Sequence, residues 1–148
     1  VGLVAACDMA IAADNALSCL SEVKLGLIPS VISPYVLAAM GSRAARRYFL
    51  TAERFNATEA HRLGLVHDVV PADNLATACD RLIRYLLAAG PAALTNAKRL
   101  IADVTGQPID SDLIGDTARR IAGTRASAEG QEGISAFLDR RKPGWLTD

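Results

Sequence analysis

The feature that most constrains the fold is a change in apolar spacing about halfway along the chain. Up to residue 70, apolar residues come in short runs separated by turn-forming residues, which is typical of strands and short helices. From residue 71 onward they recur every three or four residues, as on one face of an amphipathic helix. The clearest series is Leu75, Ala78, Cys79, Leu82, Ile83 and Leu86. The sequence therefore predicts an α/β fold, with a strand-containing part over residues 1–70 and a helical part over residues 71–148.

Turn and cap residues divide the first part into short elements. Two strands, residues 10–13 and 16–19, flank the pair Asp14-Asn15, and another strand is predicted over residues 65–70.

Helices are predicted between these strands. Pro34 at a first helical position and Gly41 as a stop delimit one helix, and a second follows directly. Asn56 with Glu59 forms a capping-box pattern for a third, which ends at Gly64.

Four helices are predicted in the second part. The helix with the periodic apolar face ends at Gly90, and Pro91 opens the next. Ser111 and Ser127 each supply a start for a further helix. No period of 20 to 50 residues is visible.

Composition excludes several classes of function. With 51% hydrophobic residues the chain can form a core, and its 16 basic residues balance 16 acidic ones, so charge gives no reason to expect nucleic acid or a membrane as partner. The apolar runs fall short of the roughly 20 residues that span a bilayer. We therefore expect a soluble, cytoplasmic protein. The first residues already resemble the inside of a domain.

Cysteines and histidines give no sign of a metal site or a disulfide framework. Cys7, Cys19 and Cys79 lack metal-ligand spacing and are expected to be small buried apolar residues in a reducing compartment. His61 and His67 are isolated, and a surface or strand-end place without a metal role is predicted. The aromatic residues Tyr48, Phe49 and Phe55 are expected to pack in the core.

Glu22 is the strongest candidate for chemistry. No glycine-rich phosphate loop, HExxH motif or GxSxG motif is present. Glu22 lies in a short polar gap between Leu20 and Val23 after an apolar strand, where a carboxylate is partly desolvated and suited to acid/base work. The alternative is a surface glutamate paired with Lys24 or another cation.

Four segments occur in an order and spacing that carry a family resemblance. They are Cys7-Asp8-x-x-Ile11-Ala12-Ala13, Ser21-Glu22-x-x-Leu25-Gly26-Leu27-Ile28-Pro29, Ala60-x-x-Leu63-Gly64-Leu65-Val66 and Glu132-Gly133-x-x-Ala136-Phe137-Leu138-x-Arg140-Arg141-Lys142-Pro143. Together they resemble the C-terminal portion of the crotonase superfamily, the enoyl-CoA hydratase/isomerase group. The resemblance implies a crotonase-like fold, with the end of a ββα superhelix in residues 1–70 and a helical region in residues 71–148 that covers coenzyme A and builds trimers.

The resemblance implies a role for each matched residue. Glu22 would be the acid/base that exchanges a proton with the α-carbon or with the added water. Gly2 stands where many hydratases have a second glutamate, so Glu22 would work alone. The substrate or its coenzyme A part would be contacted by Gly2, Leu20, Ser21, Ser30, Ile121 and Arg140.

Two of these contacts concern the coenzyme A part. Ile121 matches an apolar position near the adenosine, and Arg140 matches a basic position that meets the phosphates. The alternative for Arg140, Arg141 and Lys142 is a solvated helix end that complements the helix dipole.

The implied function is an acyl-CoA hydratase that adds water across the α,β double bond of an enoyl-CoA. The segment Ser30-Val31-Ile32-Ser33-Pro34 departs from the usual glycine-rich pattern and resembles bacterial hydratases that act on methylglutaconyl-CoA or related branched substrates. A double-bond isomerase is the first alternative. The second is an inactive binding or assembly fragment, because the backbone donors of the family's oxyanion hole would precede Val1. No metal and no cofactor besides the substrate's coenzyme A is expected, and a homotrimer or hexamer is predicted.

Overall fold

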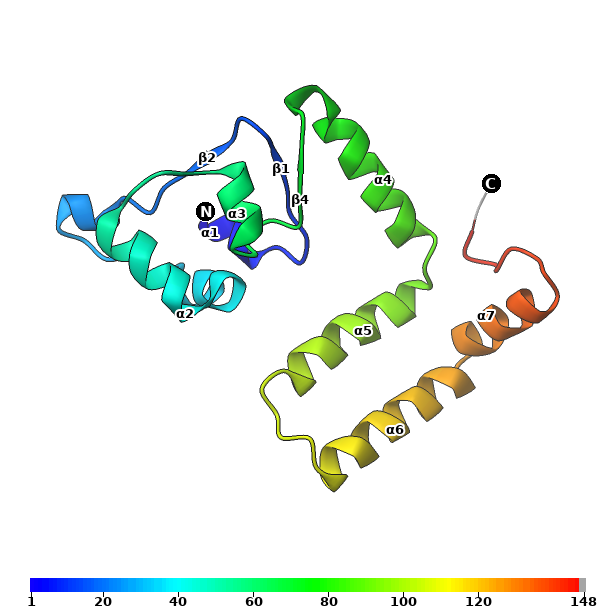
Figure 1. Ribbon diagram of the computed structural model, residues 1–148. Helices are drawn as coiled ribbons and strands as arrows, with labels where there is room; N and C mark the ends of the chain where they lie inside the picture. The colour runs from blue at the N-terminus through cyan, green and yellow to red at the C-terminus, as the bar shows by residue number, and fades with distance from the viewer. Residues whose placement is uncertain (147–148) are drawn as a thin grey trace. The chain divides into compact units, whose positions relative to one another are not determined.

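The computed structural model describes residues 1–146, which form two compact units, residues 1–80 and residues 81–146. The first unit contains α1 (Gly2–Ala6), β1 (Ile11–Ala13), β2 (Leu17–Ser18), the 3₁₀ turn η1 (Glu22–Leu25), α2 (Ser33–Thr51), β3 (Phe55–Asn56), α3 (Ala57–Arg62), β4 (Asp68–Val70), η2 (Ala72–Asn74) and the start of α4 (Leu75–Leu87). The second contains the rest of α4, α5 (Pro91–Val104), α6 (Ser111–Ala126) and α7 (Ala128–Leu138) (Figure 1). Strands and helices together confirm the predicted α/β class. The roles predicted for residues 1–70 and 71–148 stay a prediction.

The strands form two separate pairs. β1 lies parallel to β4, with Ile11 opposite Asp68, and β2 lies antiparallel to β3, with Leu17 opposite Asn56. His67 extends the first pair, because its backbone N–H donates to the Ala10 carbonyl at 2.7 Å and its Nδ1 accepts from the Ala10 N–H at 3.1 Å. The predicted strand-end place of His67 is confirmed.

The predicted helix breaks and caps of the first unit are present. Gly41 has φ 74° and ψ 160° inside α2, so the helix is kinked where the stop was expected. The Asn56 side chain accepts from the Glu59 N–H at 2.9 Å, but the Glu59 carboxylate does not complete the box; it accepts from the Tyr48 hydroxyl at 2.8 Å and from Arg62. Half of the predicted capping box is therefore formed, because a tertiary partner takes the other half.

A cluster of buried apolar residues holds the first unit together. It consists of Leu20, Val36, Met40, Tyr48, Phe55, Ala60, Leu65 and Val66, with Phe49 partly buried against it. The rings of Tyr48 and Phe55 have centroids 4.4 Å apart, which confirms the predicted packing role of the aromatic residues.

The cysteines are all free thiols, and one prediction about them is wrong. Cys19 and Cys79 are partly buried, but Cys7 is exposed. Cys7 follows the last turn of α1, where its Sγ donates to the Leu3 carbonyl at 3.1 Å, so a local bond takes the place of burial.

Side-chain caps define the helices of the second unit. Ser127 caps α7 by accepting from the Gly130 N–H at 3.1 Å, and Asp110, one residue before the predicted start at Ser111, caps α6. Pro91 opens α5 as predicted, and the N–H groups of the next two residues donate to the carboxylate of Glu129 at 2.9 and 2.8 Å. Thus α7 caps α5 across 36 residues of sequence.

Among residues 1–146, no helix combines the length and the apolar character that crossing a membrane requires.

Candidate active site

The backbone around Glu22 is held by a buried apolar residue before it and by a tight turn after it. Leu20 is 2% exposed and belongs to the core cluster. Ser21 directly precedes η1, and its carbonyl accepts from the Lys24 N–H at 3.0 Å, while the carbonyl of Glu22 accepts from the Leu27 N–H at 3.0 Å. Gly26 ends the turn at φ 71°, a left-handed conformation that glycine adopts without strain. Glu22 is therefore held between a buried residue and a closed turn.

One oxygen of the Glu22 carboxylate is an acceptor that no described residue pairs with. Its Oε2 atom is buried and has no hydrogen-bond partner among the described residues. No ion pair joins Glu22 to Lys24 in this part of the chain, and Lys24 is exposed. A buried acceptor without a partner carries a desolvation penalty of about 1–3 kcal/mol, so such groups are uncommon in folded proteins and often serve chemistry. The Oε2 atom of Glu22 is therefore available to accept a proton, as an acid/base group requires.

Gly2 lies against Ile32 too closely for any side chain. A Cβ atom at Gly2 would be 2.2 Å from Cγ2 and 2.9 Å from Cβ of Ile32. Both distances are below what carbon atoms tolerate, and Ile32 cannot swing away by its far end alone, because its Cβ is involved. A second carboxylate at Gly2 therefore has no room in this structure.

The segment that carries Ser30 is a compact turn leading into α2. The Ser30 N–H donates to the Ile28 carbonyl at 2.8 Å, and the Ser33 hydroxyl donates to the Ser30 carbonyl at 2.8 Å. Val31 at its tip is 84% exposed, while Ser21 and Ser30 are both exposed. Ser21 and Ser30 are thus accessible to solvent, whereas Leu20 is buried.

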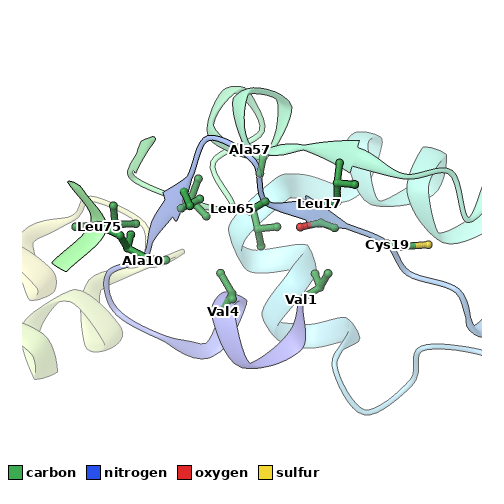
Figure 2. A pocket seen from close by; sticks show the side chains of 15 residues that line it. Val1, Val4, Ala10, Leu17, Cys19, Ala57, Leu65 and Leu75 are labelled. Carbon is green, nitrogen blue, oxygen red and sulfur yellow. The ribbon is translucent and has the colours of Figure 1, made fainter. Parts of the chain in front are cut away.

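An apolar pocket of about 500 Å³ lies in the same unit but does not include Glu22. Figure 2 shows Val4 of α1 and Val1, which directly precedes this helix, on one side of it and Leu17, Ala57 and Leu65 on the other. Its polar side chains are Ser18 and Cys19, neither of which has a basic partner. The pocket offers an apolar surface without an acid/base group, so it is not where Glu22 would act.

Ile121 lies in the second unit on α6. It is 66% exposed and lines a groove of about 510 Å³ between α5 and α6 that also contains Leu100, Arg99 and Arg119. The groove joins apolar side chains to guanidinium groups, a combination that suits a ligand with a flat apolar part and a negative charge.

Arg140 lies in the turn that ends α7, and its neighbour Arg141 behaves differently. Arg140 has φ 54°, a left-handed conformation that costs a non-glycine residue about 1–2 kcal/mol. Its side chain has no hydrogen bond or ion pair among the described residues. The Arg141 guanidinium instead pairs with Glu132 through two bonds of 2.6 and 2.9 Å.

The Glu132 carboxylate is held ionised by these bonds. Arg141 first, and then the Gly144 N–H, lower the pKa of Glu132 from 4.5 to about 2. The Arg141 guanidinium is thus paired with Glu132 although 43% of its side chain is exposed, and Arg140 is exposed as well, so the two alternatives for this basic cluster stay predictions.

The predicted site residues fall into two sets. Glu22, Gly2, Leu20, Ser21 and Ser30 lie in the first unit, and Ile121 and Arg140 lie in the second. No group of three or more histidine, cysteine, aspartate or glutamate side chains within residues 1–146 is arranged to hold a metal ion.

Two residues that shape these sets were not found from sequence. Ile32, which closes the position beside Gly2, gives no signal because the contact joins distant segments. Glu132 belongs to the C-terminal motif, but no helical spacing rule predicts its pairing with Arg141 nine residues later.

Comparison with known proteins places the chain in a family context. The family model described as enoyl-CoA hydratase/isomerase matches residues 1–148. A solved structure from Legionella pneumophila, assigned to the enoyl-CoA hydratase/isomerases (crotonase), has a TM-score of 0.95 and 48% identity, covering 98% of this chain and 56% of that chain. An enoyl-CoA hydratase structure from Shewanella pealeana has a TM-score of 0.92 and 49% identity, covering 97% and 54%. The expected crotonase-like fold is confirmed.

A curated relative with a different activity is also similar. The 1,2-epoxyphenylacetyl-CoA isomerase of Escherichia coli is 33% identical over 138 residues, 92% of this chain and 52% of its own length. The chain spans about half the length of the curated relatives that it matches.

Proposed function

This chain belongs to the enoyl-CoA hydratase/isomerase family, and on that premise we propose that the native protein is an acyl-CoA hydratase with Glu22 as its acid/base. The observation that carries the proposal is the Oε2 atom of Glu22, which is buried and has no hydrogen-bond partner within residues 1–146. It is an acceptor that the fold holds in place without using it.

The reaction requires one group that moves a proton twice. Glu22 accepts a proton from water while the water oxygen bonds to the β-carbon, and the electron pair of the double bond shifts into the thioester as an enolate. The same carboxyl then returns its proton to the α-carbon. One water is consumed and the carboxylate is regenerated, so a single glutamate is sufficient.

Replacing Glu22 by Gln in the native-length protein tests the assignment. Gln has the same shape but cannot accept the proton, so we expect the turnover of crotonyl-CoA to fall by about 10²–10⁴-fold while coenzyme A still binds. Glu53→Gln, the same change at a glutamate paired with Arg47 in the first unit, is the control and should leave turnover unchanged. Full activity of Glu22→Gln would refute the role of Glu22.

Double-bond isomerisation is the second candidate, and the contact between Gly2 and Ile32 favours it. With no room for a second carboxylate, one glutamate could carry a proton between two carbons of the acyl chain. Turnover in ¹⁸O-water separates the candidates, since hydration incorporates solvent oxygen into the product and isomerisation does not.

For the acyl group we propose a branched, carboxylated enoyl-CoA such as methylglutaconyl-CoA. Support comes from the resemblance of the Ser30–Pro34 segment, whose Ile32 and exposed Val31 would form part of the pocket wall. The kcat/KM for methylglutaconyl-CoA should exceed that for crotonyl-CoA. A preference for crotonyl-CoA would contradict this choice and leave hydration itself untouched.

We further propose that a second copy of the chain covers the apolar face of α5 and α6, in a homotrimer or hexamer. A groove of about 400 Å³ there is lined by residues such as Leu100, Ile109 and Ile114, and the two isoleucines are 88% and 58% exposed. Light scattering measures the assembly, and an assay of the 148 residues alone tests the alternative of a binding or assembly fragment. A cytoplasmic setting, and no cofactor besides the substrate's coenzyme A, complete the proposal.

A further inference from the structure

Two neighbouring arginines in the turn after α7 differ in their contacts: Arg141 is paired with Glu132, and Arg140 has no ion pair among the described residues. We propose that Glu132 is a positioning residue, which holds this turn in the shape that directs Arg140 to the phosphates of an acyl-CoA. The inference rests on the proposed function, because it takes the ligand to be a coenzyme A thioester. It adds a residue that acts through Arg140 without touching the substrate.

The backbone of the turn explains why Arg140 is strained. The Arg140 N–H donates to the Phe137 carbonyl at 3.3 Å, and the Arg141 N–H donates to the Ala136 carbonyl at 3.0 Å. These two bonds form a Schellman motif, in which the residue at the position of Arg140 must be left-handed and is usually glycine. An arginine there requires other contacts to keep the turn closed.

Glu132 supplies those contacts from the preceding helix. Its two carboxylate oxygens bind the two terminal nitrogens of Arg141, and its Oε1 also accepts from the Gly144 N–H at 2.8 Å. One carboxylate thus binds both Arg141, the residue directly after Arg140, and Gly144. The turn is closed on both sides of the position that would contact phosphate.

A second contact fixes the far end of the same segment. The Trp145 Nε1 donates to the Ala88 carbonyl at 3.3 Å, and its ring lies 3.0 Å from where a Cβ on Gly133 would be. Glycine at position 133 therefore lets the tryptophan approach α7. Residues 139–146 are held at Glu132 and Trp145, and the Arg140 side chain extends from the segment between them.

This arrangement also prevents competition between the arginines. Arg141 forms a two-pronged pair with Glu132, and its Nε also lies 3.6 Å from a carboxylate oxygen of Asp139. Arg140 has no such partner among residues 1–146, so its guanidinium remains available for a two-pronged bond to phosphate. Without the Glu132 carboxylate, Arg141 would lose its ion pair and Arg140 could leave its left-handed backbone conformation. The Arg140 side chain would then no longer be held in one orientation.

The test compares two substrates in the native-length protein. Crotonyl-CoA carries the nucleotide phosphates, and crotonyl-pantetheine carries the same thioester without them. For Glu132→Gln we expect the KM for crotonyl-CoA to rise by about tenfold with kcat unchanged, and the kinetics with crotonyl-pantetheine to stay as in wild type. Arg140→Ala should behave in the same way, and the double variant should show no further loss, because both changes remove one interaction.

The matched control is Glu129→Gln, which changes the other glutamate of α7. Glu129 binds α5 and not the turn, so its replacement should lower the melting temperature. The KM for crotonyl-CoA relative to that for crotonyl-pantetheine should stay as in wild type. Arg141→Lys, which keeps the charge but not the fork, should give an intermediate KM.

If Glu132→Gln raised the KM for both substrates by the same factor, the inference would be overturned. Additive increases in KM in the double variant would overturn it as well. If wild type turns over neither thioester, the proposed function fails. Calorimetric titration with coenzyme A then decides the inference separately, since Glu132→Gln and Arg140→Ala should weaken binding by the same factor.

Discussion

The two units differ in what holds them together. The first has a continuous apolar core around residues such as Leu20, Val36 and Tyr48. In the described part of the second, Ala136 is the one buried apolar residue, and side chains such as Ile109 and Phe137 are 88% and 81% exposed. In the second unit, hydrogen bonds to carboxylates connect the elements. Glu129 binds the start of α5, and Glu132 binds the turn after α7.

The difference shows that regular helices need not produce a core. The periodic apolar faces of α5 and α6 exist in the sequence, but within the second unit little covers them. Directional bonds fix the geometry of this unit, whereas burial supplies most of the stability of the first.

Removing core volume should affect the first unit most. Leu20→Ala is expected to lower the free energy of unfolding by about 2–5 kcal/mol, because it deletes a side chain that is 2% exposed and leaves a cavity. Leu50→Ala, the same deletion at a residue 76% exposed on α2, should change it by less than about 0.5 kcal/mol. Urea denaturation measures both, and equal losses would show that the cluster is not the stabilising core.

Acid should weaken the second unit before the first. The pKa of Glu132 is lowered from 4.5 to about 2, chiefly by Arg141, and that of Glu59 equally, chiefly by Arg62. Because a lowered pKa stabilises the folded state only while the carboxyl is ionised, this contribution is complete above about pH 4.5 and is lost as pH falls toward 2. The first unit keeps its apolar core in that range.

Amide exchange followed by NMR at stepwise lower pH measures the order of loss. Protection in α7 and residues 140–146 should fall between pH 4.5 and 2 while α2 stays protected. Simultaneous loss in both units would mean that they share one cooperative transition.

Removing the remote cap of α5 should have a moderate effect. Glu129→Ala deletes two bonds to helix N–H groups and is expected to destabilise the second unit by about 1–2 kcal/mol. Faster exchange of the Ala92 and Ala93 amides would locate the change. Glu129→Gln keeps one acceptor oxygen and should give a smaller effect; the reverse order would contradict the capping role.

The smallest effect on folding is expected at the exposed apolar face. Ile114→Ser should alter the stability of the isolated unit by less than about 0.5 kcal/mol, since the side chain is 58% exposed. If this face contacts a second copy, the same change should lower the mass measured by light scattering. Ala118→Ser, also exposed on α6, is the control, and an unchanged mass for Ile114→Ser would argue against this face as the contact.

Sequence reasoning succeeded where the cause is local. The break at Gly41, the cap at Asn56, the opening of α5 at Pro91 and the cap at Ser127 each depend on residues within a few positions. It could not find contacts between distant segments. Nothing near Glu129 indicates that it caps α5, and the alternation around β1 does not reveal that its partner is β4. Cys7 was wrongly expected to be buried because its residue type, not its neighbours, decided the prediction.

For the candidate site the division is the same. The position of Glu22 after an apolar strand was readable, and family motifs supplied its proposed role. The burial of its Oε2 without a partner in the described part of the chain, and the closed space at Gly2, are evident only from the fold.

The contact between Gly2 and Ile32 also limits how this protein can change. A glutamate introduced at position 2 alone would collide with the isoleucine, so the gain of a second carboxylate depends on an earlier or simultaneous reduction of Ile32. The two positions are therefore epistatic, and their order of substitution matters. A library that varies position 2 in the wild-type background would return few folded proteins, whereas one built on Ile32→Ala or Ile32→Gly opens a mutational path to different acid/base chemistry.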